Sequence, residues 1–81
     1  MYFVYILRSI KDGSYYTGVT EDIEKRLDEH NSGTSKYSSG KRPFTLAWHC
    51  VFQDKQLAYR FEKYLKSGSG IAFRNKHLLS E

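Results

Sequence analysis

The stretch from Tyr2 to Ser9, "YFVYILRS", constrains the fold more than any other part of this 81-residue chain. β-Branched and aromatic residues occupy both alternating faces, as expected of a central strand that is buried on both sides. A chain of this length forms one domain, near the size at which a single core is only just sufficient. We therefore expect this strand to lie in the middle of a small sheet, with helices on both faces.

A hairpin is predicted directly after this strand. "KDGS" contains the Asp-Gly pair that favours a tight turn, and "YYTGV" returns as the second strand. With two central turn residues, Tyr5 lies opposite Thr20, and Tyr5 and Tyr16 share a face about 13 Å apart along the strands. A longer turn or a bulge would change this register. The sequence leaves both possibilities open.

Three helices and a third strand can be placed by their patterns. Thr20 can cap a first helix, which Asn31-Ser32-Gly33 ends. The third strand is "FTLAWHCVF", from Phe44 to Phe52, with an apolar residue at every second position. Asp54 caps a second helix, "KQLAYRFEKYLK", "SGSG" ends that helix, and "IAFRNKHLL" predicts a short terminal one. The apolar stripe of the second helix comprises Leu57, Ala58, Phe61 and Leu65.

The element order is therefore β-β-α-β-α-α. This order belongs to the α+β class, with a small three-stranded antiparallel sheet flanked by helices in a single domain over residues 1–81. Three strands cannot shield both faces of their own sheet, so the helices must cover them.

Polar residues recur on the inner or border faces of these elements. On the first helix, Arg26 and His30 fall on the same side as Ile23 and Leu27, where a helix that only packs would carry Leu or Ala. The first two strands, the second helix and the terminal helix each contribute a similar group. The polar residues in such positions are Tyr5, Tyr16, Arg26, His30, Glu62 and Asn75.

Charge and cysteine content narrow the function classes. A net charge of +4 and a pI near 9.3 favour a polyanionic partner. Three cations and no acid lie in "KYSSGKR", from Lys36 to Arg42. The single cysteine, Cys50, excludes an intramolecular disulfide and a cysteine-based zinc site, and fits a reducing compartment. Because no stretch resembles a membrane span or signal peptide, we expect a cytoplasmic protein.

These residues and their order resemble the GIY-YIG nuclease superfamily, in particular its small standalone bacterial members, which are similar to the N-terminal domain of the excision-repair nuclease. "FVYIL" corresponds to the first motif and "YTG" to the second. "EDIEKRLDEH" corresponds to the Arg-bearing helix and "AYRFEKYLK" to the Glu-bearing helix. Phe3 stands where the first motif has Gly, and Thr17 where the second has Ile. The likeness covers nearly the whole chain and implies the GIY-YIG endonuclease fold.

The resemblance implies a divalent-metal-dependent endonuclease that hydrolyses DNA phosphodiester bonds in DNA repair or processing. Glu62 would be the sole protein ligand of one Mg²⁺ or Mn²⁺ ion, since Mg²⁺ keeps several waters. Arg26 would stabilise charge on the scissile phosphate. Tyr5 would act as general base or position the attacking water, with help from His30 or Tyr16. Gly18 would let the backbone pass closely beneath the site.

Each of these residues also has an ordinary structural explanation. Glu62 can be a solvated charge on a helix flank, and Arg26 can form a salt bridge to Asp22 or Glu29. His30 suits the C-terminal end of a helix dipole. Tyrosines are common in sheets.

Nucleic-acid contacts are predicted for the basic loop and for two positions beyond it. These residues are Lys36, Tyr37, Lys41, Arg42, Lys66 and Asn75, and Lys63, Arg74 and Lys76 can extend the surface. A solvated loop is the competing interpretation of the first four. Without a base-reading motif, we expect branched, nicked or single-stranded DNA as partner, with RNA as a further candidate. The alternative function is a non-catalytic nucleic-acid-binding domain, or an interaction module of a larger repair complex.

Overall fold

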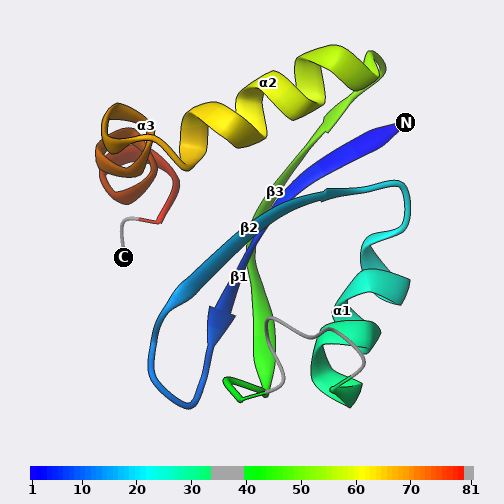
Figure 1. The fold of residues 1–81 in the computed structure, drawn as a ribbon, viewed down its shortest axis with the longest axis vertical. Helices are drawn as coiled ribbons and strands as arrows, with labels where there is room; N and C mark the ends of the chain where they lie inside the picture. Colours follow the sequence, from blue (N-terminus) through cyan, green and yellow to red (C-terminus); the bar gives the residue numbers. More distant parts are fainter. Residues whose placement is uncertain (34–39, 80–81) are drawn as a thin grey trace.

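A three-stranded antiparallel sheet forms the centre of the molecule (Figure 1). The computed structural model describes residues 1–33 and 40–79. The strands are β1 (Tyr2–Ser9), β2 (Tyr15–Thr20) and β3 (Phe44–Phe52), in the spatial order β2-β1-β3. The helices are α1 (Ile23–Ser32), α2 (Lys55–Leu65) and α3 (Gly68–Phe73), and α3 runs into a π-helical stretch, Arg74–Leu78. The predicted class, element order and central strand are confirmed.

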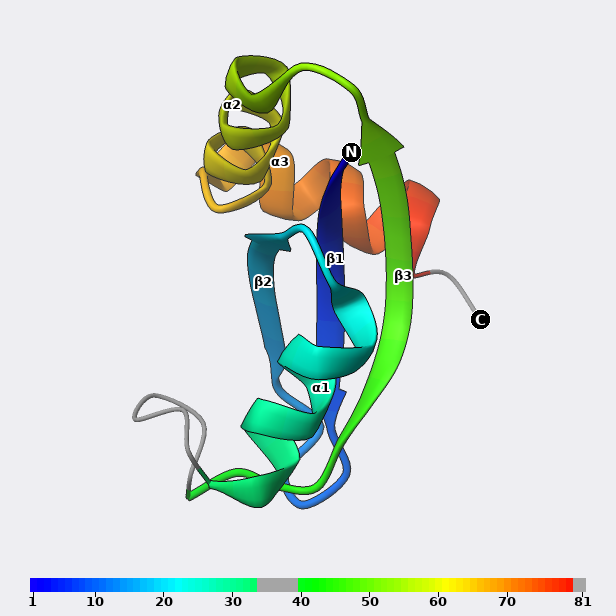
Figure 2. The ribbon, with the colours of Figure 1, turned by 90° about the vertical axis from the view of Figure 1, so that its right-hand side faces the viewer.

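The two faces of the sheet carry separate cores. On one face, Tyr5, Leu7 and Phe44 are buried against Ile23 and Leu27 of α1. On the other face, Val4, Ile6, Ala58 and Leu65 are buried together, and α2 and the C-terminal segment pack there. Figure 2 shows α1 in front of the sheet, with α2 and α3 toward its other side. Burial of each large apolar side chain contributes about 1.5–3 kcal/mol, so both helical layers are needed by so short a chain.

The β1–β2 connection is longer than a two-residue turn. The Ser9 N–H donates to the Ser14 carbonyl at 2.8 Å, and the Gly13 N–H donates to the Ser9 carbonyl at 2.9 Å. Gly13 has φ 76°, a conformation that glycine adopts without steric cost. Tyr5 consequently pairs with Gly18 rather than with Thr20, and Tyr16 pairs with Leu7. The register for a two-residue turn, with Tyr5 and Tyr16 far apart, is therefore wrong.

A bulge divides the apolar residues of β3 between the two faces. Ile6 pairs with Trp48, but Leu7 pairs with Leu46, so Ala47 is the extra residue of β3. Such a bulge reverses the side-chain alternation that follows it. Phe44 and Leu46 thus face α1, whereas Trp48, Cys50 and Phe52 pack in the core on the α2 side.

Three local predictions at helix ends and on α2 need correction. Asp22, not Thr20, is the N-cap of α1, because its side chain accepts from the Lys25 N–H, while the Thr20 hydroxyl accepts from the Asp22 N–H. Leu57 is 46 % exposed and does not belong to the buried stripe of α2. The terminal helix begins at Gly68 rather than at Ile71.

A close approach of the backbone explains the early start of α3. Ser67 is its N-cap and accepts from the Gly70 N–H at 3.1 Å. A Cβ at Gly70 would clash with the Tyr64 carbonyl of α2, so this glycine permits the close contact between the two helices. Gly33, with φ 83°, ends α1 as predicted. Within the described part of the chain, no helix is long and apolar enough to cross a membrane.

Candidate active site

Tyr5 lies at the centre of the sheet, with its phenol directly above Gly18 of β2. Its side chain is only 2 % exposed. A Cβ at position 18 would lie 2.5 Å from Tyr5 Oη and 2.7 Å from Cζ, closer than real Cβ atoms come to other atoms. Gly18 is therefore the residue that gives the phenol its place, since any side chain there would displace it. The Asp-Gly loop contributes indirectly, because it sets the register that pairs these two residues.

The Tyr5 hydroxyl connects two side chains of α1. Arg26 Nε donates to Tyr5 Oη at 3.3 Å, and Tyr5 Oη lies 3.4 Å from His30 Nε2. Because Arg26 cannot accept a hydrogen bond, the phenol oxygen accepts from it with one of its two lone pairs and keeps its own proton available for His30. His30 Nε2 accepts that proton when the neutral imidazole carries its own proton on Nδ1. Residues 26 and 30 are one helical turn apart, which is why both reach the same hydroxyl.

Aromatic contacts complete this cluster. The rings of Tyr16 and His30 are 4.7 Å apart between centroids, and those of Tyr5 and Tyr16 are 6.3 Å apart. Phe44 lies against the other side, 5.7 Å from the His30 ring. We call Tyr5, Tyr16, Arg26 and His30 the tyrosine cluster. Four of the five predicted catalytic residues are thus brought together on the α1 face of the sheet.

Burial controls the protonation of the cluster. Desolvation raises the pKa of Tyr5 to about 12, and the hydrogen bond from Arg26 only partly offsets it. Desolvation and the nearby Arg26 charge lower the pKa of His30. Hydrogen bonding to Tyr5 is the largest factor that raises the pKa of Arg26. At neutral pH the cluster therefore holds a neutral phenol, a neutral imidazole and one guanidinium charge.

Of the two salt-bridge partners that the sequence suggested for Arg26, Asp22 and Glu29, the structure shows Glu29. In addition to Tyr5, its Nη1 donates to Glu29 Oε1 at 3.2 Å, and both side chains are about one-third exposed, at 33 % and 39 %. Asp22 instead caps the helix. The exposed part of the guanidinium is the part that a phosphate can reach.

Glu62 stands apart from the hydrogen-bonded cluster. It lies on α2, with 19 % of its side chain exposed, and its Oε2 accepts from Lys66 Nζ at 3.0 Å. Its charge nonetheless contributes to raising the pKa of Tyr5, so the carboxylate acts on the phenol through space. Lys66 also lines a pocket with Tyr16 and Thr17 of β2, which places the Glu62–Lys66 pair beside the sheet edge next to the cluster.

The predicted nucleic-acid contacts are only partly located. Lys36 and Tyr37 lie outside the described residues. Lys41 is exposed and lies 3.9 Å from Asp12. Exposed Arg42 packs its guanidinium against Gly33.

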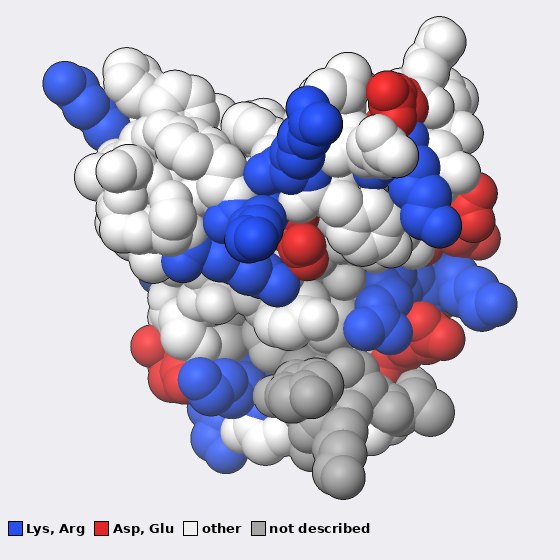
Figure 3. Space-filling model, turned by 45° about the horizontal axis from the view of Figure 1, so that its top comes forward, with Lys and Arg blue, Asp and Glu red and all other residues white. Residues whose placement is uncertain are grey.

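Figure 3 shows Lys and Arg side chains gathered on the face that carries α2, with an acidic group against them. Asn75 is exposed and accepts from Arg74 Nε at 3.1 Å.

Sequence reasoning missed Asn31 as a residue that positions the cluster. Its Nδ2 donates to the Phe44 carbonyl at 3.1 Å, and its Oδ1 accepts from the Phe44 N–H at 2.6 Å. This pair attaches the end of α1 to β3 and holds Phe44 against His30. The only signal was the helix-ending character of Asn31, which says nothing about a partner 13 residues away.

The residues that could hold a metal are few. Over residues 1–33 and 40–79, no group of three His, Cys, Asp or Glu side chains could hold an ion. The Glu62 carboxylate is a single hard oxygen donor on a regular helix. Such a donor fits Mg²⁺ or Mn²⁺, because these ions can be held by one carboxylate together with waters and substrate phosphate.

Comparison with known proteins shows the family and the fold of this chain. The family described as "GIY-YIG catalytic domain" matches residues 1–74. A UPF0213 protein of Halalkalibacterium halodurans is 44 % identical over 66 residues, which cover 80 % of this chain and 69 % of that protein. A UPF0213 protein of Vibrio campbellii is 39 % identical over 64 residues; the match spans 78 % of this chain but only 61 % of the relative. A solution structure of a UPF0213 protein from Bacillus halodurans superposes with a TM-score of 0.56 at 39 % identity, covering 94 % of this chain and 84 % of that one.

Proposed function

We propose that this chain, which belongs to the GIY-YIG catalytic domain family, is a divalent-metal-dependent endonuclease. Its reaction would be the hydrolysis of phosphodiester bonds in DNA. Membership supports a nuclease role in general. The observation that carries the proposal is the Arg26–Tyr5–His30 chain of hydrogen bonds above Gly18. A buried tyrosine that only packs needs one hydrogen-bond partner for its hydroxyl, whereas this hydroxyl lies against both a guanidinium and an imidazole.

Arg26 is the residue that binds the scissile phosphate in this proposal. Its Nε is held by Tyr5, while the rest of its planar fork lies at the surface beside Glu29. A guanidinium held in this way can donate to phosphate oxygens as negative charge develops on them. Its raised pKa keeps it charged at every working pH.

Tyr5 orients the attacking water, and the Tyr5–His30 pair removes the water's proton. A phenol with a pKa near 12 is a poor base by itself, because it is not ionised at neutral pH. Transfer of its proton to His30 Nε2, as the water's proton moves to Tyr5 Oη, avoids a free phenolate. The water oxygen then forms a bond to phosphorus as the P–O bond to the leaving strand breaks. The leaving oxygen departs with the electron pair and takes a proton from solvent, and His30 ends the step as imidazolium. Tyr16, packed on the His30 ring, keeps the imidazole in place.

Glu62 would hold the metal ion, which when bound supplies Lewis-acid polarisation of the phosphate and stabilises charge on the leaving oxygen. The ammonium of Lys66 now shares this carboxylate, so Lys66 has to turn outward as the ion binds. Lys66 is 53 % exposed and can then contact a phosphate instead.

The expected substrate is DNA with a branch, nick or single-stranded part, cut with little sequence specificity in repair or processing. Lys and Arg side chains gather on one face of the described residues (Figure 3), and contacts of such cations to phosphates carry no sequence information. Lys41 and Arg42 are the described part of the predicted basic loop, and both are exposed.

One observation favours the alternative, a binding or repair-complex module without catalysis. The Glu62 carboxylate is already neutralised by Lys66 at 3.0 Å, and an ion pair of this kind is also a common surface feature. On that interpretation the chain binds DNA, and added metal changes nothing.

The test is a cleavage assay on a panel of branched and linear DNAs and RNAs, with and without Mg²⁺ or Mn²⁺. Tyr5→Phe removes only the hydroxyl of the cluster, whereas Tyr2→Phe makes the same change elsewhere on β1. We expect metal-dependent cleavage of branched DNA by the wild type and by Tyr2→Phe, and strongly reduced cleavage by Tyr5→Phe. Binding of DNA by all three proteins with no cleavage by any would favour the module.

A further inference from the structure

We propose that a pocket at the edge of β2 binds one unpaired nucleobase of the DNA strand. The β2 pocket has a volume of about 230 Å³ and lies where β2, the end of α2 and α3 meet. Its walls are formed by Tyr15, Tyr16, Thr17, Lys66, Ile71 and Arg74, with Leu65 behind them. The proposal rests on the proposed nuclease function, since it names the part of a DNA substrate that this site recognises.

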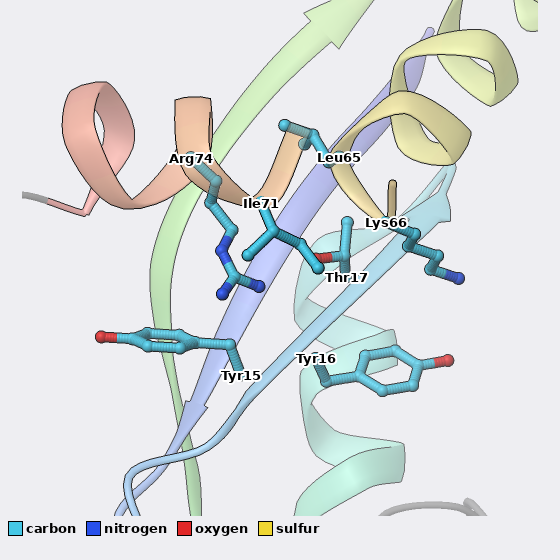
Figure 4. A pocket seen from close by; sticks show the side chains of 7 residues that line it. All are labelled: Tyr15, Tyr16, Thr17, Leu65, Lys66, Ile71 and Arg74. Atoms are coloured by element: carbon cyan, nitrogen blue, oxygen red, sulfur yellow. The ribbon is translucent and has the colours of Figure 1, made fainter. Parts of the chain in front are cut away.

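A flat stacking surface is the first feature of the pocket. The Arg74 guanidinium lies over the Tyr15 ring, 5.0 Å from its centroid, and Figure 4 shows both side chains at one side of the pocket. Arg74 Nε donates to Asn75 Oδ1 at 3.1 Å, which fixes the rotation of the guanidinium. Unpaired bases stack on aromatic rings and on guanidinium planes. The pair thus offers a pre-oriented surface for one base.

The remaining walls match the shape of a single base. Ile71 is 38 % exposed, although it is a large aliphatic residue, and Leu65 is fully buried behind it. Thr17 places a hydroxyl among these apolar side chains (Figure 4). A volume of 230 Å³ lies below the roughly 300–1,000 Å³ of pockets for drug-sized ligands. One flat ring system with a polar edge fits this space better than an extended ligand.

The positive charges around the pocket favour an anionic ligand. Lys66 and Arg74 line it, and none of its lining residues is acidic. Lys66 also forms the ion pair with Glu62 at 3.0 Å, which ties the pocket to the proposed metal ligand one helical turn away. A strand with its base in the pocket therefore carries its phosphate past Lys66 toward Glu62. A paired base would first have to leave its stack, which favours substrates in which this base is already unpaired.

The direct test compares two DNAs that differ by one base. Each is a branched duplex with one unpaired nucleotide at the junction, and in the second DNA that nucleotide is abasic, so all phosphates remain. Affinity is measured by fluorescence anisotropy without metal, so that no strand is cut. We expect the wild-type protein to bind the base-containing DNA about tenfold more tightly, in line with the loss of one stacked base. Equal affinities would overturn the proposal and would mean that something other than a base occupies the pocket.

Variants separate stacking from charge. Arg74→Lys keeps the charge but removes the flat plane, so the preference for the base-containing DNA should be lost. Lys76→Ala is the matched control, because it removes an exposed cation from the same segment outside the pocket. It should weaken both complexes equally and keep the preference. A preference retained by Arg74→Lys would contradict stacking on the guanidinium.

Failure of this proposal is distinguishable from failure of the nuclease function. Cleavage of branched DNA without discrimination against the abasic form would contradict only the proposal that the β2 pocket binds a base. Discrimination without cleavage in any metal would leave the pocket standing in a binding module. Circular dichroism of each variant shows whether its fold is retained, and the comparison of the two DNAs on the wild type needs no variant.

Discussion

At the scale of single residues, the Tyr5 hydroxyl is the point on which the account depends. It meets a glycine on one strand and two side chains of a helix that are one turn apart. Burial raises the pKa of the Tyr5 hydroxyl and lowers the pKa of His30, so both groups are neutral at pH 7. Both groups are therefore in the forms that proton transfer from a water requires.

Replacement of Arg26 separates catalysis from stability. Arg26→Ala removes a partly exposed ion pair and one hydrogen bond, so we expect the free energy of unfolding to fall by only about 1 kcal/mol. Cleavage should fall by about 10²–10³, because a contact made in the transition state is lost. Glu29→Gln is the control that breaks only the ion pair and should cleave normally. Thermal unfolding that falls in step with activity would support a purely structural salt bridge.

The role of Gly18 can be tested by comparison with Gly68, where a Cβ would meet no other atom. Gly18→Ala places a Cβ 2.5 Å from Tyr5 Oη, so the phenol has to move away from Arg26 and His30. We expect a loss of about 1–3 kcal/mol in stability from overpacking, together with most of the cleavage activity. Gly68→Ala has no heavy atom within 4 Å of the new Cβ and should leave both unchanged. Urea unfolding and the cleavage assay measure the two effects, and a wild-type result for Gly18→Ala would mean that the phenol has another place to go.

His30 should make stability depend on pH. Its pKa is lowered in the folded protein, so the unfolded chain binds the proton more readily below the ordinary value of about 6.5. The stabilisation is thus complete above that value and is lost as pH falls through the lowered pKa. We expect a lower Tm at pH 5 than at pH 7.5, and a smaller difference in His30→Gln. A pH dependence that is unchanged in His30→Gln would assign it to other groups.

At the scale of elements, the sequence predicted the regular strands and helices but not the geometry of the connections between them. The apolar run of β1 predicted the central strand, and Gly33 and Asp54 marked the ends of helices correctly. The hairpin was misjudged because Asp-Gly favours a short turn locally, whereas Ser9, Asp12 and Ser14 stabilise a longer one by hydrogen bonds. The bulge at Ala47 leaves no trace in the alternation of β3.

These connections decide where the site residues meet. Residue types and helical spacing suffice to put Arg26 and His30 together, since both lie on one helix. The meeting of Tyr5 with Tyr16 and Gly18 depends on the length of the hairpin loop, and the contact of Phe44 with His30 depends on Asn31. Such long-range pairings are properties of tertiary packing that local sequence does not encode.

The basic loop before β3, from Lys36 to Arg42, carries a prediction at the scale of elements. Replacing Lys36, Lys41 and Arg42 together by Ala should flatten the dependence of DNA affinity on salt, by up to about 0.9 units of log–log slope for each lost phosphate contact. Lys25→Ala, an exposed cation on α1, is the control and should change the slope little. The measurement is a titration of affinity at several salt concentrations. An unchanged slope in the triple variant would show that the loop does not contact phosphates.

At the scale of the whole molecule, the sheet separates two contributions to one proposed reaction. α1 brings the phosphate-binding and proton-transfer groups to one face, while α2 presents Glu62 and Lys66 from the other side at the edge of β2. The charge of Glu62 still acts on Tyr5, so the two contributions are electrostatically coupled. A substrate strand that passes along the β2 edge would meet both.

Glu62→Gln tests whether the carboxylate on α2 holds the metal ion that cleavage requires. The amide has nearly the shape of the carboxylate but is a poor sole ligand for a hard, strongly hydrated cation. DNA binding and DNA cleavage are measured on the same branched substrate over a titration of Mg²⁺ or Mn²⁺. The account predicts that the variant binds DNA as well as the wild type or slightly better, since one negative charge is gone. It also predicts that cleavage falls by orders of magnitude and that added metal restores little of it. Equal cleavage by the variant and the wild type would contradict the account.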